Sequence, residues 1–295
     1  IAYNKNKIIK LPDNGLERNR QNAIQVYTGN GDELIWVGGY QEGQEPGAIY
    51  AYIAEGIYRS DEEVMGQAGN LIDKTVSSTG GGKYMYGPNE WAKRTDAQKA
   101  NALPIQAGDV RWKDVNKDGV LDTFDKVYMG NSTPRWIGGI TNSISWKGLT
   151  FVSRFDYALG HYQVDNMRTF FMGCLQGTFN TIVETKDSWT PENPNAKYPK
   201  YYWADQNGKR NYDRHANSQF VYNASYLSIR ELTLSYSLPK TIVNKIGAVN
   251  SEFSITGQNL GYITKSKLFS PEQGGTVGGG YALPTTVIFG ISLTY

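Results

Sequence analysis

The sequence predicts an all-β chain that forms part of a transmembrane antiparallel β-barrel, and three observations lead to this prediction. The composition is rich in strand and turn formers, with 21 tyrosines, 7 tryptophans and 33 glycines among 295 residues. The segment 286–295 alternates apolar and polar side chains with a period of two. Short and long connections alternate along the chain, as in barrels whose turns and loops lie on opposite sides of a membrane.

Several function classes are excluded or disfavoured by the bulk numbers. No apolar run reaches about 18 residues, which excludes a membrane-spanning helix. The net charge of +2, from 30 basic and 28 acidic residues, gives no reason to expect a nucleic-acid partner. A single cysteine, Cys174, rules out an intrachain disulfide. Because the chain starts at Ile1 without an initiator Met, we expect that processing or truncation has removed an earlier part.

The first 58 residues predict strands. We expect one strand over 1–11, a hairpin of strands 24–27 and 34–37 around the turn residues 29–32, and a strand over 48–58 with apolar side chains on both faces. A long polar connection follows over 59–136, and its acidic start at Asp61 favours a short helix.

The strongest hairpin prediction joins 137–146 to 149–159 through Lys147 and Gly148. On the second strand, Arg154 and Asp156 share one face, which suits a wet barrel interior better than the dry core of a soluble β-sandwich.

The rest of the chain continues the alternation. A structured connection over 160–222 leads to a strand over 226–238, whose apolar parity changes near Arg230 and therefore predicts a β-bulge. Another strand surrounds residues 253–257, and a glycine-rich loop precedes the final strand. If the terminal residue lies on the periplasmic side, the loops 59–136, 160–222 and 261–284 are extracellular, and the turns at 147–148 and 239–250 are periplasmic.

One segment carries metal-binding chemistry. Residues 114–125, D-V-N-K-D-G-V-L-D-T-F-D, match the calcium loop of EF-hands with Asp in place of the closing Glu. Calcium takes about six to eight oxygen ligands, which alternate positions of a tight loop can supply, and Gly119 permits the sharp turn. We predict a structural Ca²⁺ here, and the alternative is a surface turn without metal. The predicted ligands are the side chains of Asp114, Asn116, Asp118, Asp122 and Asp125 and the backbone carbonyl of Val120.

The sequence does not predict an enzyme. His161 and His215 are the only histidines, and neither stands in a zinc spacing or beside a nucleophile pattern.

Several stretches together resemble the carboxyl-terminal region of SusC/RagA-type TonB-dependent outer-membrane transporters. They are 108–113 with the calcium-like loop, 129–135, 138–139, the hairpin at 146–149, 223–239, 257–260 and the terminal strand. The resemblance covers most of 108–295 and is weaker over 1–58. It implies that residues 1–295 are the carboxyl-terminal part of a plugged barrel of about 22 strands in the bacterial outer membrane, with the plug absent from this sequence.

The same resemblance implies a function and partners. Such transporters import glycans or peptides together with a SusD-like surface lipoprotein, and TonB acts on the plug. Four aromatic residues of the second long loop could contact the substrate or the lipoprotein, or could simply pack the loop: Tyr198, Tyr201, Tyr202 and Trp203.

Two other interpretations compete with the transporter. One is a secreted, calcium-stabilised β-domain that binds carbohydrate, and the other is a self-contained barrel of about eight strands. A barrel would present residues such as Phe151, Phe155, Phe289 and Ile291 to lipid, whereas a secreted domain would not.

Overall fold

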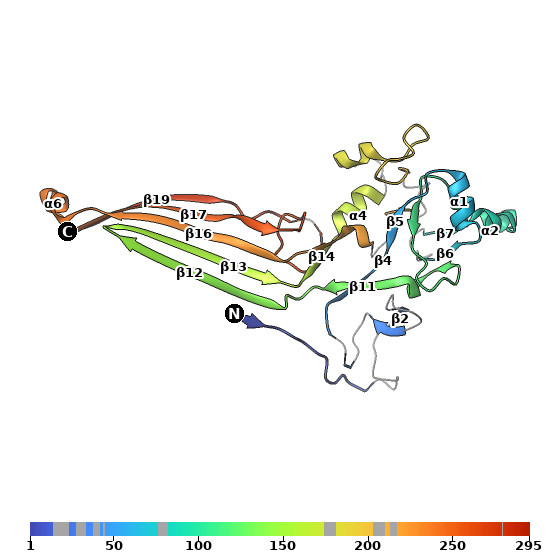
Figure 1. Cartoon of the computed structure of the whole chain (residues 1–295), viewed down its shortest axis with the longest axis horizontal. Coiled ribbons are helices and arrows are strands. Elements are labelled where there is room, and N and C mark those ends of the chain that lie inside the picture. Colours follow the sequence, from blue (N-terminus) through green and yellow to red (C-terminus); the bar gives the residue numbers. More distant parts are fainter. Residues whose placement is uncertain are drawn as a thin grey trace.

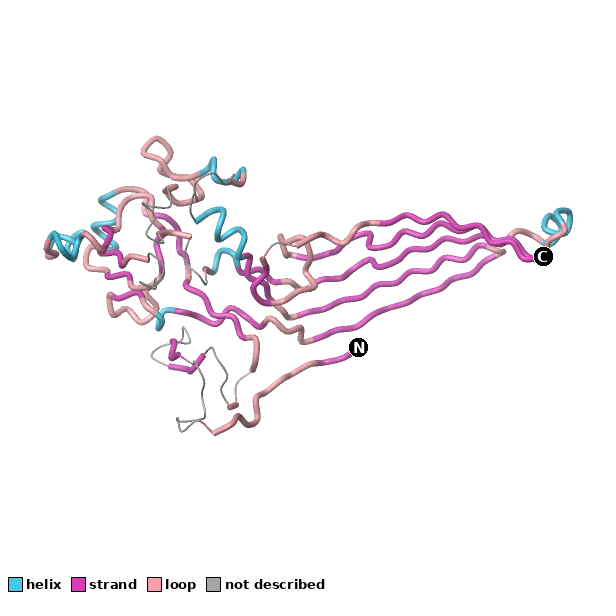
Figure 2. The backbone as a smooth tube through the Cα atoms, turned by 180° about the vertical axis from the view of Figure 1, so that it is seen from behind, coloured by secondary structure: helices cyan, strands magenta, loops and turns pink. Residues whose placement is uncertain are grey.

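The chain consists of a long antiparallel sheet with a mixed body of short strands and helices at one end of it, as seen from two sides in Figures 1 and 2. The computed structural model describes residues 1–13, 24–27, 34–37, 42–43, 45–75, 82–173, 181–202, 210–212, 217–278 and 280–295. No helix in these ranges is both long and apolar enough to cross a membrane.

The long sheet has six strands in the order β1-β12-β13-β16-β17-β19, and every neighbouring pair is antiparallel. Within the described residues this sheet is open, with β1 and β19 at its edges, so it is not a closed barrel of eight strands. The strands span Ala2–Tyr3 (β1), Trp136–Trp146 (β12), Leu149–Leu159 (β13), Tyr226–Ser237 (β16), Asn250–Thr264 (β17) and Thr286–Thr294 (β19).

The two faces of this sheet differ in polarity because the strand registers place the apolar side chains of neighbouring strands opposite one another on the same face. Ile144 stands opposite Phe151, Phe151 opposite Leu234, Leu234 opposite Ile255, and Ile255 opposite Phe289. The exposed large side chains on this apolar face are Trp136, Ile140, Ile144, Trp146, Leu149, Phe151, Leu159, Leu234, Tyr236, Phe253, Ile255, Ile263, Val287, Phe289, Ile291 and Leu293. A continuous exposed apolar face suits lipid and disfavours a secreted domain in water.

Polar side chains occupy the opposite face. Arg154 and Glu231 are cross-strand partners with 3.6 Å between Nη1 and Oε2, and the hydroxyls of Thr233 and Thr256 lie 2.9 Å apart. The prediction that Arg154 and Asp156 face away from the apolar side is confirmed.

The hairpin between β12 and β13 is confirmed together with its two-residue turn. Lys147 has φ of 49° and Gly148 has φ of 86°, the left-handed pair that matches the twist of the flanking strands. The bulge near Arg230 is confirmed as well, since the register of β13 with β16 shifts between Arg154 and Phe155 and leaves Arg230 as an extra residue.

The segment 59–136 is not the extended polar connection that was expected. It takes part in two small cores in the body at the other end of the sheet. Tyr52, Trp112 and Leu121 belong to one core. Tyr58, Val64 and Met85 belong to the other. The apolar residues stand at irregular spacings, which explains why periodicity does not show them. The helices are α1 (Asp61–Ala68), α2 (Pro88–Ala92), α3 (Asp96–Lys99) and the 3₁₀ turn η2 (Thr123–Asp125).

Short strands connect these cores. The strand expected over 48–58 is broken at Ile53 into β4 (Ala48–Tyr52), which pairs with β11 (Lys126–Asn131), and β5 (Ala54–Ile57), which pairs with β9 (Val110–Trp112). A four-stranded sheet has the order β10-β6-β7-β8. Its strands are β6 (Ile72–Asp73), β7 (Tyr84–Tyr86), β8 (Ala102–Pro104) and β10 (Val120–Leu121).

The helix expected to start at Asp61 is confirmed, and the Ser60 hydroxyl caps it by accepting the Glu63 amide. The early hairpin is also confirmed, because β2 (Ile24–Tyr27) pairs with β3 (Leu34–Val37), although its turn lies outside the described residues. Of the strand expected over 1–11, only Ala2–Tyr3 forms.

The remaining elements lie in the connections of the long sheet. Segment 160–222 contains β14 (Tyr162–Asp165), α4 (Asn166–Gly173), the turns η3 (Val183–Asp187) and η4 (Ser218–Phe220), and β15 (Val221–Asn223). In the last long connection β18 (Gly275–Val277) pairs with β14. The turn between β16 and β17 contains α6 (Lys240–Val243) and η5 (Asn244–Ile246).

Replacing Gly148 by Ala tests the turn that joins β12 to β13. A Cβ at Gly148 would lie 2.8 Å from the Ser237 carbonyl oxygen and would have to adopt a left-handed φ. We expect a loss of about 2 kcal/mol in the free energy of unfolding, measured by urea unfolding of the folded protein in lipid vesicles. Gly278→Ala is the matched control, because its Cβ would meet no atom within 4 Å. Equal stabilities for the two variants would contradict the assigned turn.

Candidate functional site

The predicted calcium-binding segment runs from the end of β9 through β10 to η2, and its polar side chains bind the segment's own backbone. Asp114 accepts the amides of Lys117 at 2.7 Å and Gly119 at 2.9 Å, and Asp118 accepts the amide of Val120 at 2.7 Å. Gly119 has φ of 82°, so the sharp turn expected at this glycine is present.

The other predicted ligands are also engaged within the segment. Asn116 accepts the Asp118 amide and Asp122 accepts the Phe124 amide. Asp125 is fully buried and accepts the amides of Val115 at 2.7 Å and Asp122 at 2.8 Å.

Burial raises the pKa of the Asp125 carboxyl to about 6, because a charged carboxylate loses its hydration there. The structure describes no group of three or more His, Cys, Asp or Glu side chains placed to hold a metal ion in the ranges given above. The calcium site therefore stays a prediction.

The aromatic residues predicted to contact a substrate or a lipoprotein are largely packed inside the body. Tyr198 is 8% exposed and belongs to the first core, and Tyr202 is 9% exposed. The Tyr202 hydroxyl accepts the Gln106 side-chain amide at 2.5 Å, and the buried ion pair of Asp109 with Arg210 lies beside it. Tyr201 is half-buried, and Trp203 lies outside the described residues. Burial of Tyr198 and Tyr202 favours the loop-packing role over the contact role.

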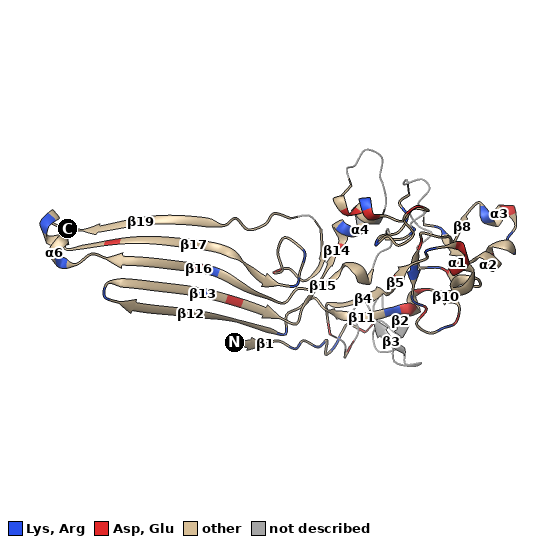
Figure 3. Ribbon diagram, turned by 45° about the horizontal axis from the view of Figure 1, so that its top comes forward, with Lys and Arg blue, Asp and Glu red and all other residues tan. Residues whose placement is uncertain are grey.

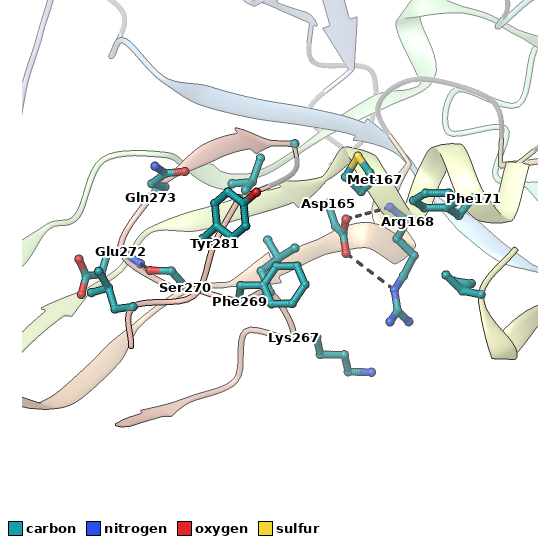
Figure 4. A pocket seen from close by; sticks show the side chains of 16 residues that line it. Asp165, Met167, Arg168, Phe171, Lys267, Phe269, Ser270, Glu272, Gln273 and Tyr281 are labelled. Atoms are coloured by element: carbon teal, nitrogen blue, oxygen red, sulfur yellow. Dashed lines mark hydrogen bonds and ion pairs between the residues drawn. The ribbon is translucent and has the colours of Figure 1, made fainter. Parts of the chain in front are cut away.

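A groove of about 580 Å³ lies between α4 and the connection that precedes β19. Its volume is in the range of small-ligand sites. Figure 4 shows Phe269 and Tyr281 projecting from this connection beside Met167 and Phe171 of α4. Phe269 is 72% exposed and Tyr281 is fully exposed.

The lining of the groove is mainly apolar, and most of its charges are already paired. Asp165 and Glu184 both bind Arg168, at 3.7 Å and 3.0 Å, and Glu272 binds Arg230 at 2.5 Å. Lys267 forms no ion pair with any residue in the described part of the chain. The Lys267 ammonium lies 5.9 Å from the centre of the Tyr222 ring. The groove therefore combines aromatic and aliphatic side chains with one cation that has no anionic partner in the described residues.

The wall of the long sheet holds the connection that forms one side of the groove. The Arg230 guanidinium binds Asp156 on β13 and Glu272 in the connection. His161 Nε2 lies 2.8 Å from the Pro271 carbonyl oxygen, and Gln163 donates to the carbonyl oxygens of Ser270 and Gln273. These contacts fix residues 270–273 against the start of β14.

No local pattern in the sequence predicts this groove. Its two sides are about a hundred residues apart in the chain, and neither α4 nor residues 265–284 follow a clear hydrophobic period. Phe269, Tyr281 and Leu283 within a glycine-rich connection were the one available signal, because large apolar residues in an exposed loop need a partner.

Arg230→Gln tests whether the bulge residue holds the connection. Loss of the guanidinium leaves Asp156 and Glu272 without their shared cation, and we expect trypsin to cleave after Lys265 and Lys267 about tenfold faster in the folded protein. Arg154→Gln is the control, because Arg154 pairs with Glu231 in the sheet rather than with the connection. If both variants are cleaved at the rate of the native protein, Arg230 does not hold the connection.

No family model matches the chain. The chain is 29% identical over 204 residues to TonB-dependent receptor P26 of Formosa agariphila, which covers 65% of this chain and 20% of that protein. It is 23% identical over 260 residues to TonB-dependent receptor P3 of the same organism, covering 88% of this chain and 21% of that protein.

Solved structures are also similar to the chain. The RagAB peptide importer in the open-open state matches with a TM-score of 0.61 and 21% identity, over 99% of this chain and 26% of that chain. The RagAB peptide transporter matches with a TM-score of 0.58 and 19% identity, over 90% and 24%. The all-β fold of an outer-membrane barrel is thereby confirmed.

The chain spans only about a fifth to a quarter of the length of these proteins. Those proteins are named as receptors and as a peptide importer. Together with the two-faced sheet, these likenesses confirm the predicted resemblance to SusC/RagA-type TonB-dependent transporters.

Proposed function

We propose that the chain forms part of the wall and the outer loops of a TonB-dependent transporter in the bacterial outer membrane. The exposed apolar face of the six-stranded sheet carries this proposal, because such a face is stable against lipid while the polar face lines a wet interior. The folded body lies at the end of the sheet that the sequence analysis assigns to the outside (Figure 1).

We propose that the groove between α4 and the last connection binds the imported ligand, and that this ligand is a peptide rather than a glycan. The lining includes Met167, Ile182 and Leu283, whose aliphatic side chains offer a sugar hydroxyl no hydrogen bond. Peptide side chains can bury apolar surface there, and Lys267 at the rim suits a peptide carboxylate.

The partners are proposed from the resemblance. A SusD-like surface lipoprotein would cover the body that contains α1, α2 and α3, and TonB would act through a plug domain of the complete transporter. The similarity to RagAB, which is described as a peptide importer, supports a peptide ligand for this chain.

A structural Ca²⁺ in residues 114–125 is a further proposal. Five side chains with oxygen atoms stand on one tight turn, and a carboxylate oxygen that accepts an amide hydrogen keeps a lone pair for a cation. The ion would join β9 to η2 at the edge of the first core.

The double variant Phe269→Ala, Tyr281→Ala tests the groove. We expect peptide binding to the complete transporter in detergent to weaken about tenfold, because two exposed aromatic contacts are lost. Isothermal titration calorimetry with a peptide library fraction and, separately, with oligosaccharides measures the effect.

Tyr84→Ala is the control, because Tyr84 is an exposed aromatic residue of β7 that does not line the groove. A double variant that binds peptides like the native protein would contradict the groove, and one that loses only oligosaccharide binding would contradict the peptide class.

Asp118→Asn tests the calcium proposal. The amide oxygen can still accept the Val120 amide, so the turn is kept, while one negative charge and the exposed hydrogen bond from the Asn116 side-chain amide are lost. We expect about tenfold weaker calcium binding by calorimetry, with unchanged stability in the presence of a chelator. Asp96→Asn in α3 is the control. No calcium binding by the native protein would show that the segment is a turn without metal.

A further inference from the structure

The end of the six-stranded sheet opposite the body carries three exposed lysines. Lys147 lies in the β12–β13 turn, and Lys240 and Lys245 lie in the β16–β17 connection. Figure 3 shows basic residues on α6 and at the turn between β12 and β13, at the end of the sheet away from the body. Segments 143–151 and 237–251 contain no Asp or Glu. This end therefore has a positive fringe.

The acidic residue nearest in sequence to the β16–β17 connection is directed elsewhere. Glu252 stands opposite Ser292 on the polar face of the sheet and accepts a hydrogen bond from the Ser237 hydroxyl at 3.4 Å. It therefore does not neutralise the lysines of the fringe.

Exposed apolar side chains accompany the lysines. Ile242 is 49% exposed, Ile246 is 55% exposed and Val249 is 66% exposed, while Val243 and Ala248 of the same connection are buried. The connection is fixed to the last strand, since the Val249 amide donates to the Thr294 carbonyl at 2.6 Å.

This connection adjoins the apolar face of the sheet. Tyr236, Phe253 and Leu293 end that face next to it. In the neighbouring turn Trp146 is 68% exposed, with the Lys147 ammonium 4.9 Å from its ring centre. Aromatic and basic side chains beside an apolar band are typical of a membrane interface.

We propose that this end of the sheet binds the anionic head groups of the membrane leaflet that it reaches. Ile242, Ile246 and Val249 enter the boundary between head groups and acyl chains, and the three lysines contact lipid phosphates. The proposal rests on the barrel fold and is independent of the ligand, the lipoprotein and calcium. It makes the β16–β17 connection an anchor that sets the depth of the wall in the bilayer.

The test uses the complete outer-membrane protein that contains this chain, in nanodiscs of phosphatidylcholine with or without phosphatidylglycerol. The variant is Lys147→Glu, Lys240→Glu, Lys245→Glu. The control is Lys186→Glu, Lys197→Glu, Lys265→Glu, which reverses three exposed lysines away from this end. The readouts are the thermal unfolding midpoint and the phosphatidylglycerol retained per protein in native mass spectrometry.

We expect phosphatidylglycerol to raise the midpoint of the native and control proteins, and the variant to lose this shift. Retained phosphatidylglycerol should fall about fivefold for each lysine reversed. An identical lipid-dependent shift in the variant, or no shift in the native protein, would overturn the proposal, and a periplasmic protein would then be the better occupant. If the charge reversal prevents folding, Lys→Gln substitutions at the same three positions replace it in the test.

A second measurement tests whether the exposed apolar side chains of the β16–β17 connection reach the acyl chains. In a Cys174→Ser background, an environment-sensitive fluorophore attached to Ile246→Cys should be quenched by brominated acyl chains in the folded barrel. Quenching by an aqueous quencher alone would place the connection in water and overturn the anchor. Heat-modifiable migration on gels confirms that each variant is folded.

Discussion

The structure depends on one constraint, which is that backbone amides and carbonyls inside a membrane must find partners within the protein. Strands β13, β16 and β17 meet it by antiparallel pairing on both sides, interrupted only at the bulge. Within the described residues β19 is paired along one side, and β12 has only the short β1 on its second side. Once the ladder is fixed, the side chains alternate between lipid and interior, and a single-residue slip would reverse the two faces. The clean alternation in β19 and the short turn at Lys147 and Gly148 both follow from this requirement.

Arg230 shows how the wall can be interrupted without losing its faces. The extra residue is matched on β17 by Asn259 and Leu260, with Asn259 at a φ of 51°, so that Ile229 and Leu232 both stay on the apolar face. The long polar side chain released by the bulge binds Asp156 and Glu272 on the interior side. A local change of strand parity thereby joins the barrel wall to the connection that forms the groove.

Sequence reasoning succeeded where one period governs the segment and failed where distant contacts do. The terminal strand, the β12–β13 hairpin and the bulge at Arg230 could all be predicted, because alternation and turn chemistry are local. The groove could not, because Phe269 and Phe171 line it from segments about a hundred residues apart in the chain. The aromatic residues of 198–203 were an ambiguous signal, since Tyr202 is held inside by Gln106 and Asp109, about a hundred residues away.

The irregular connections at the two ends of the sheet are stabilised in different ways. The long connections at one end bury their polar groups around two cores, and they place Tyr58 and Tyr212 so deep that burial raises the pKa of both hydroxyls. The short connections at the other end are too small to build a core, so Ile242 and Ile246 remain exposed. Exposed apolar groups on so short a connection are stable only if something other than water covers them. The adjoining apolar face is already suited to lipid, and the positive charge of the lysines is opposite to that of the lipid phosphates. The asymmetry between a self-contained body at one end and an opposite end completed by the bilayer follows directly from the lengths of the connections.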